Sequence, residues 1–127
     1  MALQALLDTS AFVRWLDGSL PTRVRRRLDR AELLVSIVTA WEIAIKPELT
    51  QAGFRPGVVE RSLEAMGARL LPITPRHTDA LYALPPHHKD PFDRMLIAQA
   101  LVERCTLVSP DQRIPLYRNV GLKVFWD

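Results

Sequence analysis

The sequence contains a single cysteine, Cys105, so it can form no internal disulfide. Cys105 lies in an apolar helical pattern, and we interpret it as a buried thiol in a reducing cytoplasm rather than as a catalytic nucleophile. No apolar run approaches the roughly 20 residues that span a bilayer. The first residues show neither a basic leader nor a cleavage site, so we expect no signal peptide. A glycine-rich phosphate loop is also absent, which argues against an enzyme that uses a nucleotide cofactor.

The composition is that of a globular protein, with 48% hydrophobic and 24% charged residues. The 127 residues have the size of one ordinary domain, and we expect a single domain over residues 1–127, without a repeat or a linker. The net charge is only +3, but six arginines and two aspartates lie in the segment 14–30. This basic segment suits a polyanion or an acidic partner, and it is equally compatible with a solvated helix face.

Short apolar stretches alternate with helical patterns along the chain. Expected strands cover residues 3–7, 33–38, 69–73, 106–108 and 123–126. Expected helices cover residues 11–16, 21–30, 39–46, 58–66, 75–84 and 90–104, and we expect a loop at 109–115. This alternation predicts an α/β domain of three layers, with a central, mostly parallel sheet of short strands and helices on both faces.

Four acidic residues follow expected strands or begin expected helices: Asp8, Glu42, Asp93 and Asp111. Because ligands of parallel sheets bind at the carboxyl ends of the strands, we expect all four residues near one edge of the sheet. Burying unpaired charge is costly, so several carboxylates at the edge of a core indicate that a cation neutralises them. Carboxylate oxygens suit Mg²⁺ or Mn²⁺.

Each carboxylate also has an ordinary structural explanation. Asp8 fits an N-cap, and Glu42 completes a Thr-x-x-Glu capping box with Thr39. Asp93 is favoured by the helix dipole by about 0.3–1 kcal/mol. Asp111 follows a proline and fits a turn. The joint pattern, rather than any single residue, therefore indicates a metal site.

Four segments resemble the PIN domain, and more narrowly the VapC-type ribonuclease toxins of bacterial toxin–antitoxin pairs. They are residues 6–11, 35–46, 88–100 and 107–111, which occur in the order and at the spacing of that family. Trp-Glu-Ile-Ala-Ile-Lys at 41–46 and Asp-Pro-Phe-Asp-Arg at 90–94 are quite specific to one branch of it. The resemblance covers nearly the whole chain.

The resemblance implies an endoribonuclease that requires Mg²⁺ or Mn²⁺, cleaves specific RNA such as tRNA or rRNA, and thereby inhibits translation and growth. It further implies a cytoplasmic protein without membrane contact, neutralised by a cognate VapB-like antitoxin, and a homodimer that assembles further with that antitoxin. The implied catalytic and metal-binding residues are Asp8, Glu42, Asp93 and Asp111. Expected supporting residues are Thr9, Ser109 and Asp90, the last of which its N-cap role explains fully. Candidates for phosphate contacts are Lys46, Arg94, Lys89, and either His87 or His88.

The sequence departs from the family pattern at two places. Pro47 and the segment 50–53, which includes Ala52, replace a Leu-Gly-Lys-like turn, so we expect the preceding helix to end early. Ser109 replaces the threonine that often stands two positions before the last aspartate, and it keeps a hydroxyl. None of the four acidic residues is lost, so nothing in the sequence indicates an inactive site.

Two other functions compete with the nuclease hypothesis. A catalytically weak PIN-like module could bind RNA or a partner protein, with the segment 14–30 forming part of a groove for an antitoxin tail. A phosphotransferase or phosphatase would also place aspartates at strand ends. However, the sequence Asp8-Thr9-Ser10 lacks the second aspartate that a haloacid-dehalogenase-like site requires.

Overall fold

A computed structural model of the protein describes residues 3–51, 53 and 55–126. Its sheet has five strands, all parallel, in the order β3-β2-β1-β4-β5. The strands are β1 (Leu3–Leu7), β2 (Ala31–Ser36), β3 (Arg69–Leu71), β4 (Thr106–Val108) and β5 (Lys123–Phe125). The chain first builds the sheet outward from β1 to β3, and it then returns to place β4 and β5 on the other side of β1. The carboxyl ends of β1 and β4 therefore flank the point where the strand order reverses, which is where α/β sheets bind ligands.

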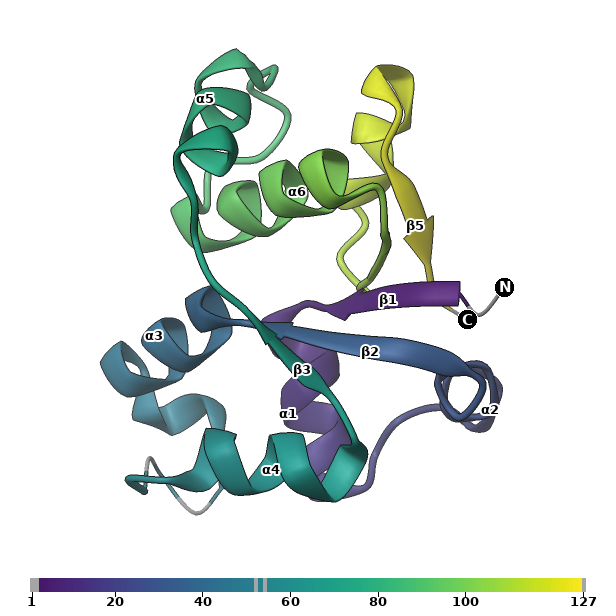
Figure 1. Ribbon diagram of the computed structural model, residues 1–127, viewed down its shortest axis with the longest axis vertical. Coiled ribbons are helices and arrows are strands. Elements are labelled where there is room, and N and C mark those ends of the chain that lie inside the picture. Colours follow the sequence, from purple (N-terminus) through teal and green to yellow (C-terminus); the bar gives the residue numbers. More distant parts are fainter. Residues whose placement is uncertain (1–2, 52, 54, 127) are drawn as a thin grey trace.

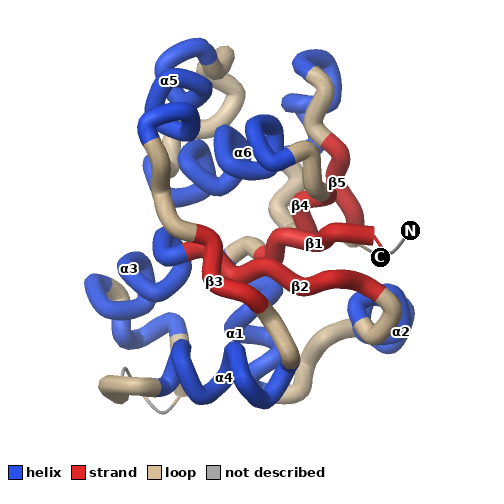
Figure 2. Tube along the Cα trace, in the orientation of Figure 1, coloured by secondary structure: helices blue, strands red, loops and turns tan. Residues whose placement is uncertain are grey.

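Helices cover both faces of this sheet (Figure 1, Figure 2). They are α1 (Thr9–Asp17), α2 (Thr22–Leu28), α3 (Ile37–Ile45), α4 (Val58–Met66), α5 (Pro75–Ala83) and α6 (Pro91–Glu103), with 3₁₀ helices η1 (Pro47–Leu49) and η2 (Ile114–Val120). In the view of Figure 1, α5 and α6 lie above the sheet, and α1, α3 and α4 lie below it. The expected three-layer α/β architecture with a parallel sheet is confirmed.

The core has two halves, one on each face of the sheet. Ala5, Leu6 and Leu7 of β1 are completely buried, because a central parallel strand is covered on both faces. Leu6 packs into the half formed with α6 and η2, whereas Ala5 and Leu7 pack into the half formed with α1 and α2. Cys105 is 3% exposed, and burial raises the pKa of its thiol to about 11, as the interpretation of an inert thiol requires.

The boundaries of β2 and α3 differ from those expected. Strand β2 begins at Ala31 and ends at Ser36, and the Ser36 hydroxyl caps α3 by accepting a hydrogen bond from the Val38 N–H at 2.9 Å. The predicted capping box between Thr39 and Glu42 is therefore wrong. A buried serine between apolar residues ended the strand earlier than the apolar pattern indicated.

Of the other predicted element boundaries, some agree with the structure and some do not. Helix α3 ends at Ile45, with Lys46 as its C-cap residue before Pro47, in agreement with the early end that we expected from the proline. Strand β3 ends at Leu71 and not at residue 73, and η2 occupies a stretch with no predicted helix. Ala52, part of the altered turn after α3, lies outside the described residues. Among the helices that the structure describes, none combines the length and the apolar character needed to cross a membrane.

Candidate active site

Asp8 is the first residue after β1 and caps α1. Its carboxylate accepts a hydrogen bond from the Ala11 N–H at 2.7 Å, and its own N–H donates to a β4 carbonyl at 3.0 Å. Only 2% of the residue is exposed. Burial raises the pKa of Asp8 from 3.8 to about 7, and the Ser109 hydroxyl offsets this only in part. The negative charges of Asp93 and Asp111 raise the pKa further.

The start of α6 supplies two more carboxylates. Asp90 is the N-cap, and its Oδ1 accepts hydrogen bonds from the N–H groups of Phe92 at 2.8 Å and Asp93 at 3.1 Å, which confirms its predicted capping role. Pro91 occupies the first helical position, where its missing N–H costs nothing. Asp93 follows within the same turn. Its pKa is raised from 3.8 to about 6, first by burial and then by the charge of Asp90, while His88 lowers it.

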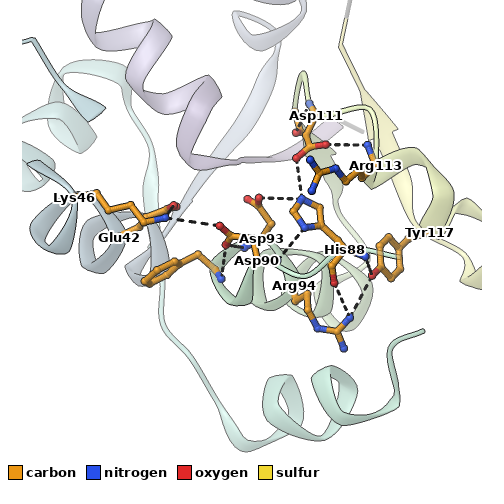
Figure 3. Close-up of polar contacts among 11 residues, drawn as sticks. Glu42, Lys46, His88, Asp90, Asp93, Arg94, Asp111, Arg113 and Tyr117 are labelled. Carbon is orange, nitrogen blue, oxygen red and sulfur yellow. Dashed lines mark hydrogen bonds and ion pairs between the residues drawn. The ribbon is translucent and has the colours of Figure 1, made fainter. Parts of the chain in front are cut away.

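His88 lies between two acidic side chains (Figure 3). Its Nε2 is 3.2 Å from the Oδ2 of Asp93 and 2.8 Å from the Oδ2 of Asp111. Its Nδ1 accepts a hydrogen bond from the Asp90 N–H at 3.1 Å, so the ring proton sits on Nε2 and points to the carboxylates. For Asp111, burial raises the pKa, but the hydrogen bonds from the Arg113 N–H and from His88 outweigh burial, and the pKa is lowered.

Glu42 projects from α3 and is 7% exposed. Its Oε2 forms an ion pair with the Nζ of Lys46, one helical turn further on, at 3.0 Å. Lys46 also lies 3.7 Å from Asp90, and the hydrogen bond to Glu42 is the main reason why its pKa is raised. The other oxygen, Glu42 Oε1, is the only buried side-chain polar atom in the described residues that lacks a hydrogen-bond partner.

The four carboxylates line a single open cleft of about 710 Å³. Asp8 and Asp111 reach it from the ends of β1 and β4, and Glu42 and Asp93 reach it from α3 and α6. The expectation that these residues gather at one edge of the sheet is therefore confirmed in its geometry.

The residues of this cleft fit a divalent cation. Crowded carboxylates whose pKa values are raised by burial and mutual repulsion gain most from a bound positive charge. The unpartnered oxygen of Glu42 is a buried acceptor that a cation would satisfy. Ligand atoms of Asp93, Asp111 and His88 lie within 4.8 Å of one another; with its Nε2 protonated, His88 orients the two carboxylates, whose oxygens are the atoms that would hold a cation. The carboxylate oxygens of the cleft suit Mg²⁺ or Mn²⁺.

Two hydroxyl groups lie beside the carboxylates, as the sequence suggested. Thr9 lines the cleft, and its Oγ1 is 3.2 Å from the Oγ1 of Thr39. Ser109 is 2% exposed, and its Oγ accepts a hydrogen bond from the Asp111 N–H at 3.1 Å. Both hydroxyls therefore hold the backbone or the side chains that frame the cleft.

Two of the four candidates for phosphate contacts are occupied inside the protein. The guanidinium of Arg94 donates to three carbonyl groups of residues 84–88 at 3.0–3.4 Å and to the Tyr117 hydroxyl at 3.3 Å. His88 is 4% exposed and faces the carboxylates described above. We therefore correct the expectation for Arg94 and His88, which position the loop before α6. Lys46 is also held by Glu42, whereas Lys89 and His87, the alternative to His88, are exposed to solvent.

Sequence reasoning missed the part that Tyr117 plays in this loop. Tyr117 is completely buried in η2, its hydroxyl donates to the Pro85 carbonyl at 2.8 Å, and it accepts from the His88 N–H at 2.9 Å. Tyr117 and Arg94 together fix the backbone that carries His88 (Figure 3). The adjacent His87 and His88 were a visible signal, but their sequence alone does not tell which ring turns inward.

Comparison with known proteins identifies the family. The family model described as "PIN domain" matches residues 5–120. This chain belongs to the PIN domain family. No curated protein matches it significantly.

Solved structures confirm the PIN fold at low sequence identity. A chain of DNA-bound VapBC from Salmonella typhimurium is 18% identical, with 97% of each chain covered and a TM-score of 0.73. FitAcB from Neisseria gonorrhoeae is 20% identical, covering 95% of this chain and 96% of that one, with a TM-score of 0.68. A toxin–antitoxin complex from Klebsiella pneumoniae is 17% identical, with 95% of each chain covered and a TM-score of 0.65.

Membership of the PIN domain family suggests a hydrolase of the nuclease type. In this PIN domain, the acidic cleft lies at the switch point of the sheet, where the fold leaves room for a ligand.

Proposed function

We propose that this protein, as one PIN domain over residues 1–127, is a metal-dependent endoribonuclease and the VapC-type toxin of a toxin–antitoxin pair. The observation that carries the proposal is the convergence of Asp8, Glu42, Asp93 and Asp111 on one cleft of a PIN fold. A cluster of this kind destabilises the folded protein unless a cation binds to it. Function, rather than stability, is therefore the reason for keeping four acidic residues there.

In this proposal the carboxylates divide the work of holding Mg²⁺ or Mn²⁺. Asp93 and Asp111 would be the more solvent-accessible ligands, and Asp8 would be the buried ligand. Glu42 would contribute its unpartnered Oε1, while its Oε2 stays paired with Lys46. When bound there, the cation supplies a water of lowered pKa and neutralises negative charge on the phosphodiester. The Nε2–H of His88 faces both Asp93 and Asp111 and would hold these two carboxylates in place beside the cation site.

Structural similarity to proteins of toxin–antitoxin pairs supports the toxin role and the antitoxin partner. The structural relatives include VapBC and FitAcB assemblies and a toxin–antitoxin complex. By analogy we propose a cognate VapB-like antitoxin as the partner, specific cellular RNA as the substrate, and the cytoplasm, where that RNA is found, as the site of action.

A homodimer is also part of the proposal. Helix α3 exposes Ile37, Trp41 and Ile45, which are spaced four residues apart and so lie on one helix face. Trp41 is 54% exposed and packs edge-to-face on Phe92 at a ring distance of 4.9 Å. This apolar face is the candidate for contact with a second copy of the chain.

The test is cleavage of total cellular RNA by the purified protein with Mg²⁺, Mn²⁺ or EDTA. We expect discrete fragments that need the metal and that disappear with Asp93→Asn, while the exposed control Asp79→Asn keeps full activity. Cleavage that survives both EDTA and Asp93→Asn would reject the metal-nuclease assignment. If the folded wild-type protein cuts no RNA under any metal, the alternative of a catalytically weak PIN-like binding module takes its place.

A further inference from the structure

A second and larger hollow lies away from the acidic cleft. It has a volume of about 1,240 Å³ and is bordered by the first residues of β1, by α2, by the end of α6, and by η2 and β5. In Figure 1, α2 lies beside the amino ends of β1 and β2, opposite the end of β2 that leads into α3. The acidic cleft, by contrast, opens at the carboxyl ends of the strands. We call this second hollow the basic groove.

The basic groove concentrates positive charge, with five cations and one carboxylate among the described residues that line it. Its charged lining consists of Arg23, Arg27, Arg104, Arg118 and Lys123, with Glu32 as the one acidic residue. In the described part of the chain, none of the five cations has a carboxylate within 4.0 Å, and the Glu32 carboxylate accepts a hydrogen bond from Gln4. The whole chain carries a net charge of only +3, so five cations around one groove are a local excess that attracts a polyanion.

Aromatic rings alternate with these cations at the floor of the groove. The Arg27 guanidinium lies 4.2 Å from the ring centroid of Phe125, and the neighbouring Trp126 also lines the groove. A guanidinium stacked on a ring keeps its N–H edge available for a phosphate, and the rings offer faces on which bases stack. Cations interleaved with aromatic rings are the pattern by which proteins bind single-stranded nucleic acid.

Arg14 connects the basic groove to the acidic cleft. Its side chain lines the acidic cleft, and its guanidinium lies 5.6 Å from the ring centroid of Trp126, which lines the groove. Residues that line the two hollows are therefore in contact with each other. The groove also adds cations to a site where Arg94, His88 and Lys46 are occupied by internal contacts.

We infer that the basic groove is a phosphate-binding exosite for RNA, which holds the strand beyond the segment that enters the acidic cleft. The inference rests on the proposed function, since it takes RNA as the substrate. It assigns a binding role to residues that are far apart in the sequence, on α2, after α6, in η2 and in β5. It also predicts that this surface reads the sugar–phosphate backbone rather than the base sequence.

The test compares two double variants with the same change of charge. The groove variant is Arg23→Glu with Lys123→Glu, both at exposed positions that line the groove. The control is Arg26→Glu with Arg76→Glu, both exposed and both outside the groove lining. The milder pair Arg23→Ala with Lys123→Ala replaces the groove variant if charge reversal lowers its melting temperature.

The first readout is the Kd for a fluorescein-labelled polyuridine of about twenty nucleotides in EDTA, where no cleavage can occur. We expect the groove variant to weaken binding at least about tenfold relative to the control variant at low salt. The slope of log K against log salt should fall by about 1.4 for the two lost phosphate contacts, at about 0.7 per contact on a single strand.

Equal Kd values for the groove and control variants would overturn the inference. It would also be overturned if the groove variant lost affinity for a labelled polyglutamate but bound polyuridine like the control, because the groove would then serve an acidic protein segment. The second readout is metal-dependent cleavage, in which the groove variant should raise KM for long RNA and leave kcat unchanged. Binding in EDTA and cleavage with Mg²⁺ are separate measurements, so failure of the exosite and failure of the nuclease proposal are distinguishable.

Discussion

Replacing Asp8 with asparagine should stabilise the metal-free protein, although Asp8 is proposed as a catalytic residue. The carboxylate is 2% exposed and faces the negative charges of Asp93 and Asp111. Its folded-state pKa of about 7 lies above the ordinary value of 3.8. Asparagine has nearly the same shape, caps helices as well as aspartate does, and can still accept the hydrogen bond from the Ala11 N–H.

The size of the stabilisation by Asp8→Asn follows from the pKa of Asp8 in the folded protein. Because the folded protein binds this proton more tightly than the unfolded chain does, the stability that protonated Asp8 provides is fully present below about pH 4 and is lost as the pH rises through about 7. At 1.36 kcal/mol for each pKa unit, ionisation of Asp8 at pH 8 costs the folded state up to about 4 kcal/mol. Relaxation of the cleft reduces this figure, and we expect Asp8→Asn to gain about 2 kcal/mol, or about 6–10 °C in Tm.

The assay is thermal unfolding in EDTA at pH 5 and at pH 8. The Tm difference between Asp8→Asn and wild type should be large at pH 8 and less than half as large at pH 5, because pH 5 lies only about 1.2 units above the unfolded pKa of 3.8, where the loss of stability begins. Added Mg²⁺ should raise the Tm of the wild type and not that of the variant, because only the intact carboxylates bind the cation well. The exposed control Asp79→Asn should show neither effect.

The reasoning would be refuted if Asp8→Asn lowered the Tm by the same amount at both pH values. That result would mean that the carboxylate is satisfied by internal partners and contributes to stability as a structural group. It would remove the main physical argument for a cation in the cleft.

Two further predictions concern the frame of the site. Asp90→Ala should lower the free energy of unfolding by about 0.5–2 kcal/mol, because the N–H groups of Phe92 and Asp93 lose their acceptor. Asp90→Asn should lower it much less, since asparagine also caps helices. Urea unfolding of both variants measures the difference. Arg94→Lys should destabilise the protein by about 1–3 kcal/mol, since an ammonium cannot replace a guanidinium that donates to three carbonyl groups and to Tyr117. The exposed control Arg76→Lys should change the free energy of unfolding by no more than about 0.5 kcal/mol. A Tm for Arg94→Lys equal to that of the control would show that these hydrogen bonds do not hold the loop.

Hydrophobic periodicity was enough to predict the alternation of strands and helices and the parallel sheet. It also located the cleft, because carboxylates that follow buried parallel strands must meet at their common edge. Asp8 follows β1 directly and Asp111 follows β4 after two residues, and β1 and β4 are paired in parallel, so backbone topology brings the two residues together. Local signals failed where a polar residue was buried for a tertiary reason, as with Ser36, whose hydroxyl contacts Gln99 in the core and also caps α3.

The sequence by itself determined the fold class, the four acidic residues and the basic character of the segment 14–30, because these depend on local pattern and on strand order. Only the tertiary structure decided which side chains face one another. It turned His88 inward between Asp93 and Asp111, occupied Arg94 with backbone carbonyls, and joined arginines of α2 to Arg118 and Lys123 around one groove. Such contacts join residues distant in the chain, and their geometry follows from the packing of helices on a closed core, which no local pattern encodes.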